Sequence, residues 1–171
     1  MEMWDVYDAQ RQHKGYCVEK GTSMGSGEYH LVVHVCVFDR SGRMLIQKRK
    51  LDKPNWPGVW DFSSGGAAIA GEDSSTAAAR ELREELAVEA SPETLRPVVT
   101  VHFDEGFDDY YIIELNEETA GRIQFQKAEI DSVRWVTCRE LLQLIDEGQC
   151  GIRKAFIQLL FDMRKQRGNR T

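Results

Sequence analysis

The sequence predicts an α/β protein in which a mixed β-sheet lies between helices, forming an α/β/α sandwich. Two observations indicate this class. Runs rich in β-branched residues fill the middle of the chain, and amphipathic helical patterns follow residue 73 and recur near the C-terminus. Strands and helices that share one core in this way build a sheet covered on both faces. With 171 residues and no repeat or long linker, the chain is expected to form a single domain over residues 1–171.

The elements follow from local patterns, taken in chain order. Residues 1–20 hold "MWDVYD" and "GYCVEKG" around a turn-rich segment and predict a hairpin. "YHLVVHVCVF" predicts a buried strand, with "RMLIQKR" as its partner after the turn "DRSG". "KLDKPNWPGVWDFSSGG" predicts a structured loop that leads into a short strand, and "RPVVTVHFD" with "DYYIIELN" a second antiparallel pair. "SVRWVT" predicts a further strand, and "CRELLQLIDEG" and "GIRKAFIQLLFDMRKQ" predict the last two helices.

Composition excludes several classes of function. The net charge of −6, with only short basic runs, argues against a nucleic-acid partner. No apolar run approaches the roughly 20 residues that a membrane span needs, and the N-terminus does not resemble a signal peptide. The four cysteines are scattered without a C-x-x-C pair, which favours reduced thiols over a zinc site or a disulfide framework. We therefore expect a cytoplasmic protein.

The segment "GEDSSTAAARELREELAV" predicts a helix that begins after the N-cap residue Asp73. One stripe of the helical wheel is expected to pack on the sheet, and it consists of Ser75, Ala79, Leu82 and Leu86. Val88 is expected on the opposite flank, with the acidic residues. This helix therefore presents an apolar face and a separate acidic face.

The acidic face carries Glu81, Glu84 and Glu85 at spacings i, i+3 and i+4. Like charges at i,i+4 destabilise a helix by a few tenths of a kcal/mol per pair. Two interpretations account for them: a solvated acidic surface, or a site that binds a cation. Arg80 and Arg83 are expected on either side of the cluster and not interleaved with it, and the glycine pair upstream further favours the cation site.

The spacing of these residues resembles the signature of the Nudix family, G-x5-E-x7-R-E-U-x-E-E-x-G-U, where U is a bulky aliphatic residue. The matching positions are Gly66, Glu72, Arg80, Glu81, Leu82, Glu84, Glu85 and Val88. Ala87 replaces the family's glycine. It either adopts a left-handed backbone at a cost of roughly 1 kcal/mol, or the helix runs one residue further.

The resemblance implies the Nudix fold and a metal-dependent cleavage of a diphosphate linkage in a nucleoside diphosphate derivative or a related compound. Mg²⁺ or Mn²⁺ is the implied cofactor, since hard cations take oxygen ligands and activate water. A small-molecule diphosphate is the implied partner. The residues implied as metal ligands are Glu81, Glu84, Glu85 and the carbonyl of Gly66. Glu72 and Arg80 are implied to form a supporting ion pair.

A further carboxylate is expected from a later loop. Glu129 precedes "IDSVRW", where some family members carry a metal ligand or a general base. Four other acidic residues compete for the role of base, and they are Asp104, Glu105, Asp108 and Asp109.

Residues 30–89 also resemble isopentenyl-diphosphate isomerase, which has the Nudix fold. Gly65 stands where the isomerase has its catalytic cysteine, and Ala67 stands where it has a metal-binding histidine. His30 matches one metal ligand of the isomerase, although a packed histidine is the alternative. Glycine cannot transfer a proton, so a hydrolase is favoured; an isomerase-like enzyme and a non-catalytic nucleotide-binding domain are the alternatives.

Two cations match the isomerase's diphosphate site, Arg49 and Lys53, and are candidates for binding a substrate phosphate. Solvated strand-end charges are the alternative. Five aromatic residues are expected either in a base or lipid pocket or in the core, and they are Trp56, Trp60, Phe62, Tyr110 and Tyr111. By analogy with the family, a homodimer is also considered.

Overall fold

The computed structural model describes residues 1–53 and 56–167. Pro54 and Asn55 of the predicted tryptophan-containing loop lie outside the described residues. The strands are β1 (Met3–Tyr7), β2 (His13–Glu19), β3 (His30–Asp39), β4 (Met44–Arg49), β5 (Trp60–Asp61), β6 (Ser64–Ala67), β7 (Val99–Phe103), β8 (Gly106–Leu115) and β9 (Ile130–Val136). The helices are α1 (Ser74–Leu86), a 3-10 turn at Pro92–Thr94, α2 (Glu117–Ala120), α3 (Cys138–Asp146) and α4 (Lys154–Arg167). The 3-10 turn and α2 were not predicted.

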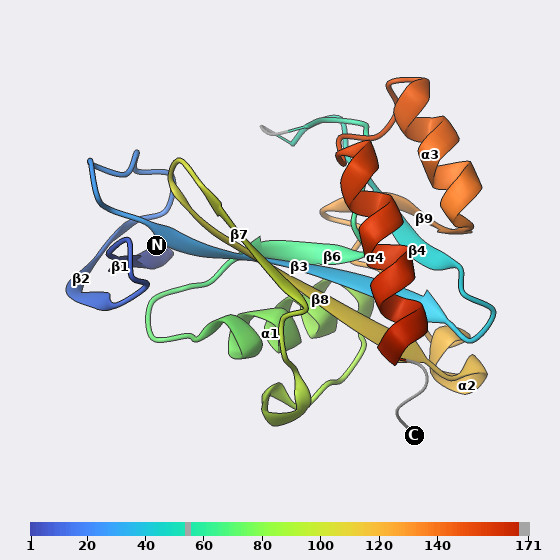
Figure 1. The fold of residues 1–171 in the computed structure, drawn as a ribbon, viewed down its shortest axis with the longest axis horizontal. Coiled ribbons are helices and arrows are strands. Elements are labelled where there is room, and N and C mark those ends of the chain that lie inside the picture. Colours follow the sequence, from blue (N-terminus) through green and yellow to red (C-terminus); the bar gives the residue numbers. More distant parts are fainter. Residues whose placement is uncertain (54–55, 168–171) are drawn as a thin grey trace.

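A mixed sheet with helices on both faces confirms the predicted α/β architecture. Figure 1 shows α1 on one face of the sheet and α4 on the other. The strand order is β5-β4-β3-β8-β7, while β6 also pairs with β3 and β9 with β4. Strand β3 pairs with β8 in parallel and with β6 antiparallel. The central strand therefore contacts the segment just before α1 and also the predicted second strand pair.

The hairpin predicted from "YHLVVHVCVF" and "RMLIQKR" is confirmed only next to its turn. The paired residues of β3 and β4 are Phe38 and Met44. Beyond them β4 leaves β3 and pairs with β9 along most of its length, and with β5 at Gln47 and Lys48. The divergence leaves β6 beside β3.

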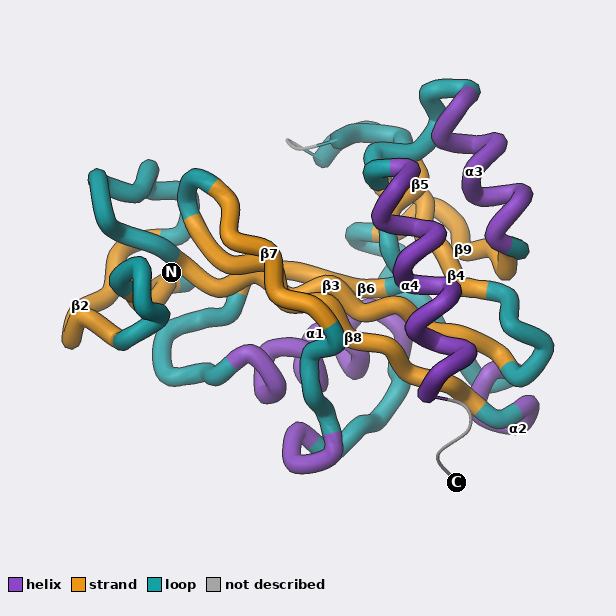
Figure 2. Tube along the Cα trace, viewed as in Figure 1, coloured by secondary structure: helices purple, strands orange, loops and turns teal. Residues whose placement is uncertain are grey.

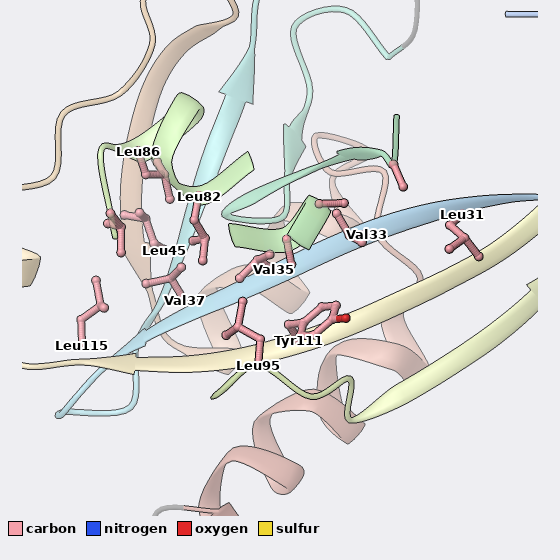
Figure 3. Packing of buried hydrophobic residues seen from close by; sticks show 14 of the residues in the cluster. Leu31, Val33, Val35, Val37, Leu45, Leu82, Leu86, Leu95, Tyr111 and Leu115 are labelled. Atoms are coloured by element: carbon pink, nitrogen blue, oxygen red, sulfur yellow. The ribbon is translucent and has the colours of Figure 1, made fainter. Parts of the chain in front are cut away.

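Successive side chains of β3 point to opposite faces of the sheet and belong to two separate apolar layers. Val33, Val35 and Val37 are fully buried against α1, together with Leu82 and Leu86 of that helix. Figure 3 shows these side chains meeting between α1 and the sheet. Cys36 and Phe38 of β3 lie in a second cluster with residues of α3 and α4. Full burial of one such aliphatic side chain stabilises the fold by about 1.5–3 kcal/mol, so this layer holds α1 firmly in place.

Helix α1 begins as predicted and ends in the left-handed turn. Asp73 accepts a hydrogen bond from the Thr76 backbone amide at 2.7 Å. Ala87 has φ 54° and ψ 34°, so the first of the two predicted endings is realised. The turn folds the chain back, and Val88 is buried in the core with Leu82; its predicted place on the acidic flank was wrong.

The apolar stripe of α1 was predicted only in part. Leu82 and Leu86 are fully buried, but Ser75 and Ala79 are half-buried. Ala77 and Ala78 take their place against the sheet.

The predicted N-terminal hairpin is formed by β1 and β2, and Figure 2 places it at one end of the sheet. Arg11, in its turn, has φ 60° and reaches the carboxylate of Asp109 on β8, 98 residues away in sequence. The side chain of Asp109 is 1% exposed and also accepts a hydrogen bond from Thr100 at 2.5 Å. The hairpin is therefore held to the sheet by an ion pair.

Two further predictions concern the whole chain. All four cysteines are free thiols, as expected, and Cys36 and Cys150 are buried. Among residues 1–53 and 56–167, no helix is long and apolar enough to cross a membrane.

Candidate active site

Arg80 of α1 is the centre of an ion-pair network. Its Nε and Nη2 atoms donate to the two carboxylate oxygens of Glu72 at 2.9 and 3.0 Å. Nη2 also donates to the carbonyl of Ala67 at 3.1 Å, and the amide of Ile69 donates to Glu72 at 3.1 Å. The ion pair implied by the family resemblance is therefore present, and it joins the loop after β6 to the helix.

The remaining nitrogen of Arg80 contacts two of the three clustered acids. Nη1 donates to Glu81 at 2.8 Å and to Glu84 at 3.2 Å. The expectation that the arginines only flank the acidic cluster was wrong for Arg80. Because residues i and i+4 are neighbours on a helix, the long arginine side chain bends over Glu84 while it still holds Glu72.

Glu85 is the most buried acid of the cluster, with 4% of its surface exposed. Its Oε2 atom accepts hydrogen bonds from the Gly65 amide at 3.0 Å and from Gln47 Nε2 at 3.2 Å. Burial, followed by the negative charge of Glu81, raises the pKa of Glu85 to about 8. Burial also raises the pKa of Glu81. Both donors to Glu85 are neutral, so they hold the carboxylate without balancing its charge.

Glu129 lies close enough to this cluster for its charge to act on it. Its carboxylate raises the pKa of both Glu81 and Glu85. Lys53 Nζ lies 3.0 Å from the Glu129 carboxylate. The predicted phosphate-binding lysine therefore neighbours the predicted fourth metal ligand.

Arg49 ends β4 beside these residues. It pairs with Ile130 of β9, and its backbone amide donates to the Val59 carbonyl at 3.0 Å. Its predicted role toward phosphate stays a prediction.

The donor set suits a hard divalent cation in charge and in chemistry. Glu81, Glu84, Glu85 and Glu129 offer carboxylate oxygens, which Mg²⁺ and Mn²⁺ prefer, and burial disfavours the ionised forms of Glu81 and Glu85. Within the described part of the chain, no three acidic, histidine or cysteine side chains converge closely enough to hold one ion as they stand. The carboxylates of Glu81 and Glu84 are instead ion-paired with Arg80 Nη1.

At the adjacent residues Gly65 and Gly66, an added Cβ atom would point to opposite sides of β6. A Cβ atom on Gly66 would lie 2.8 Å from the Glu81 carboxyl carbon, so the missing side chain makes room for that carboxylate. A Cβ atom on Gly65 would lie 2.6 Å from the Val33 carbonyl and 3.4 Å from His34 Nδ1, on the other face. A cysteine at position 65 would collide with the backbone of β3, so the site lacks both the isomerase's thiol and the space for it.

Other predicted candidates lie elsewhere. His30 stacks on Trp4 at 4.3 Å, and burial lowers its pKa. It is a packed histidine, the alternative expected from sequence. Asp109 is ion-paired to Arg11 and buried, so it does not qualify as a general base. The other three acids proposed as bases, Asp104, Glu105 and Asp108, line a separate cavity.

Sequence reasoning missed Gln47 and the backbone groups that hold the glutamates. Gln47 is a buried polar residue directly after the apolar run of Met44, Leu45 and Ile46, and its place in this strand was the available signal. The Gly65 amide and the Ala67 carbonyl are backbone groups, so the identity of the side chain does not reveal their contacts. Their roles depend on how β6 lies against α1.

The raised pKa of Glu85 predicts how stability changes with pH. Between about pH 4.5 and 8 the unfolded chain releases a proton from Glu85 that the folded chain keeps, so stability falls as pH rises through this window. In the presence of EDTA, wild type should lose stability relative to Glu85→Gln between pH 5.5 and 8, measured by urea unfolding. Mg²⁺ should reverse the loss at pH 8, because it binds the folded state. An equal difference between the two proteins at both pH values would contradict this.

Comparison with known proteins places this fold and site in a class. The NUDIX domain family matches residues 28–158. An uncharacterised Nudix hydrolase of Listeria monocytogenes is 40% identical over 164 residues, which cover 96% of each chain. The chain therefore belongs to the Nudix family. Within that family it is an enzyme of the pyrophosphohydrolase class, whose members act on small molecules and generally use divalent metal ions.

Two further similarities agree with the sequence interpretation. An isopentenyl-diphosphate Δ-isomerase of Streptomyces avermitilis is 33% identical over 141 residues, covering 73% of this chain and 71% of the isomerase. The crystal structure of a Deinococcus radiodurans protein superposes with a TM-score of 0.75 at 23% identity, covering 93% of this chain and 99% of that one. The second similarity supports the fold alone.

Proposed function

We propose that this enzyme uses Mg²⁺ or Mn²⁺ to hydrolyse a diphosphate linkage in a nucleoside diphosphate derivative or a related compound. The observation that carries the proposal is the acidic cluster on α1: Glu85 is buried beside Glu81, held only by neutral donors, and both pKa values are raised. Such an arrangement favours a bound cation, which would restore the ionised forms.

The proposed ligands of the ion are Glu81, Glu84, Glu85, Glu129 and the carbonyl of Gly66. When bound, the ion would neutralise phosphate oxygens and lower the pKa of an attacking water. The chain's own residues fix the geometry. Arg80 and Glu72 hold the loop against the helix, and Gln47 and the Gly65 amide orient Glu85. Lys53 and Arg49 are proposed to bind the phosphates.

The alternatives from sequence receive less support. An isomerase needs an acid at position 65, where the backbone of β3 leaves no room for a side chain. A domain that only binds nucleotides needs no buried carboxylate with a raised pKa. The cytoplasmic location and a homodimeric assembly stay predictions.

The test is release of phosphate-containing products from nucleotide sugars, dinucleotides, nucleoside di- and triphosphates and prenyl diphosphates, with and without Mg²⁺. Glu84 is half-exposed, so Glu84→Gln should keep the fold. It should lower metal-dependent turnover by about 10²-fold, the typical effect of removing a group that acts directly on the reacting centre. Glu89→Gln, an exposed acid beyond the helix end, is the matched control and should keep full activity. If no compound is turned over in a metal-dependent way that Glu84→Gln abolishes, the proposal fails.

A further inference from the structure

A cavity of about 850 Å³ opens on the face of the sheet that α1 does not cover. Along β3, His34 alternates with Val33 and Val35, which pack against α1, so His34 points to the opposite face. Segments from β5, β7, β8 and the start of α4 complete the lining. The proposed function assigns no role to this cavity.

Gly65 lies between the acidic cluster and His34, which lines the cavity. Its amide donates to Glu85 Oε2 at 3.0 Å, and the place of its missing side chain lies 3.4 Å from His34 Nδ1. One residue of backbone therefore separates the proposed diphosphate site from the cavity. A substrate whose diphosphate lies at the glutamates would have to pass the Gly65 backbone to reach this space.

Aromatic rings form the wall next to Gly65. The rings of His34 and Tyr110 are stacked, with centroids 4.7 Å apart and an angle of 21° between planes. Phe62 lies 5.0 Å from His34, and Phe156 lies 4.4 Å from Tyr110. Trp56, 65% exposed, also lines the cavity. Flat aromatic surfaces favour a planar ligand, because ring stacking adds to the gain from apolar burial.

Carboxylates dominate the charge of the lining, which contains Asp61, Asp104, Glu105 and Asp108, with the exposed Arg153 as a basic residue. Ionised carboxylates only accept hydrogen bonds, so they select a ligand that donates. They also repel phosphate, which keeps the diphosphate on the α1 side. A prenyl chain would remove these carboxylates from water without offering a donor, which is unfavourable.

We propose that the cavity binds the amino-bearing heteroaromatic base of a nucleoside diphosphate derivative, with Asp108 as the acceptor for the exocyclic amine. Asp108 Oδ1 lies 3.3 Å from His34 Nε2, so the carboxylate is held beside the stacked rings. The inference rests on the proposed function for the position of the diphosphate. It adds the class of group on the other side of the linkage.

The test compares substrates that differ only at the amine. Cytidine and uridine diphosphate derivatives with the same leaving group form one pair, and adenosine and inosine derivatives form the other. A carbonyl in place of the amine faces the Asp108 carboxylate and is repelled. Wild type should therefore favour the amino member at least about tenfold in kcat/KM, the typical effect of one hydrogen bond to a charged group. Asp108→Asn, whose amide can also donate to a carbonyl, should bring the two rates close to equality.

Asp162→Asn, on the exposed side of α4, is the matched control and should keep the preference. Urea unfolding checks that Asp108→Asn is folded; its side chain is 22% exposed. Calorimetric titration with cytidine and uridine, which carry no phosphate, tests the cavity separately from hydrolysis. Equal kcat/KM within both pairs, a preference that survives Asp108→Asn, or faster cleavage of a prenyl diphosphate would overturn the inference while the hydrolase proposal stands. If no compound is hydrolysed, the proposed function fails, and tighter binding of cytidine that Asp108→Asn abolishes would still support the base site.

Discussion

Glu85→Gln is expected to lower kcat by about 10³-fold, within the range for groups that act directly in proton transfer or at the reacting centre. The substitution removes the buried charge that the proposed cation needs. Its amide carbonyl can take the place of Oε2 and accept from the Gly65 amide and Gln47 Nε2, so the variant should keep the local contacts. KM should change less than kcat, because Lys53 and Arg49 are proposed to bind the phosphates independently.

Steady-state kinetics with saturating Mg²⁺ measure this loss, and Glu89→Gln is the matched control. The two acids lie one helical turn apart in sequence, but Glu85 is buried whereas Glu89 is exposed. Because Glu85→Gln also relieves an unfavourable buried charge, the variant should be as stable as wild type at pH 8 in EDTA, or more stable. A variant that is stable and still turns over at the wild-type rate would show that Glu85 is not part of the catalytic site.

Arg11→Ala is expected to destabilise the fold by about 3 kcal/mol, the lower end of the range for breaking a buried ion pair. The loss leaves the Asp109 carboxylate, 1% exposed, with the Thr100 hydroxyl as its described side-chain donor. Asp109→Ala should cost less, because Arg11 is 32% exposed and can turn its guanidinium toward water. The order of the two effects therefore follows from which partner is buried.

Urea unfolding of both single variants and of the double variant measures these values. The double variant should be more stable than the sum of the two single losses predicts, since removing both partners leaves no buried charge unpaired. Simple additivity of the two losses would contradict the buried ion pair.

The sequence was sufficient for the carboxylate helix because its information is local. The N-cap at Asp73 and the spacing of Glu81, Glu84 and Glu85 are set by helical geometry within a few turns. The same holds for strands with strong apolar runs. Pairing across the sheet is not local: β4 was assigned to β3, but it pairs mainly with β9, which lies more than 80 residues away in sequence.

Contacts between distant segments limited the prediction of the site in the same way. The ion pair of Arg80 with Glu72 was implied by the family resemblance and not by residue patterns, because it depends on β6 bringing the loop close to α1. Gln47 reaches Glu85 only because β4 diverges from β3. Neither contact is indicated by a regular spacing of residues in the sequence.

The ion pair between Arg11 and Asp109 has a consequence for the proposed base site. Asp108 and Asp109 are consecutive on β8, so they point to opposite faces of the sheet: one into the cavity, the other toward the hairpin. A shift of β8 by one residue would turn each aspartate to the opposite face of the sheet. The ion pair with Arg11 adds to the pairing with β3 and β7 that sets the register of the strand. A residue of the N-terminal hairpin thereby helps, from the other face of the sheet, to keep Asp108 on the side where the base is proposed to bind.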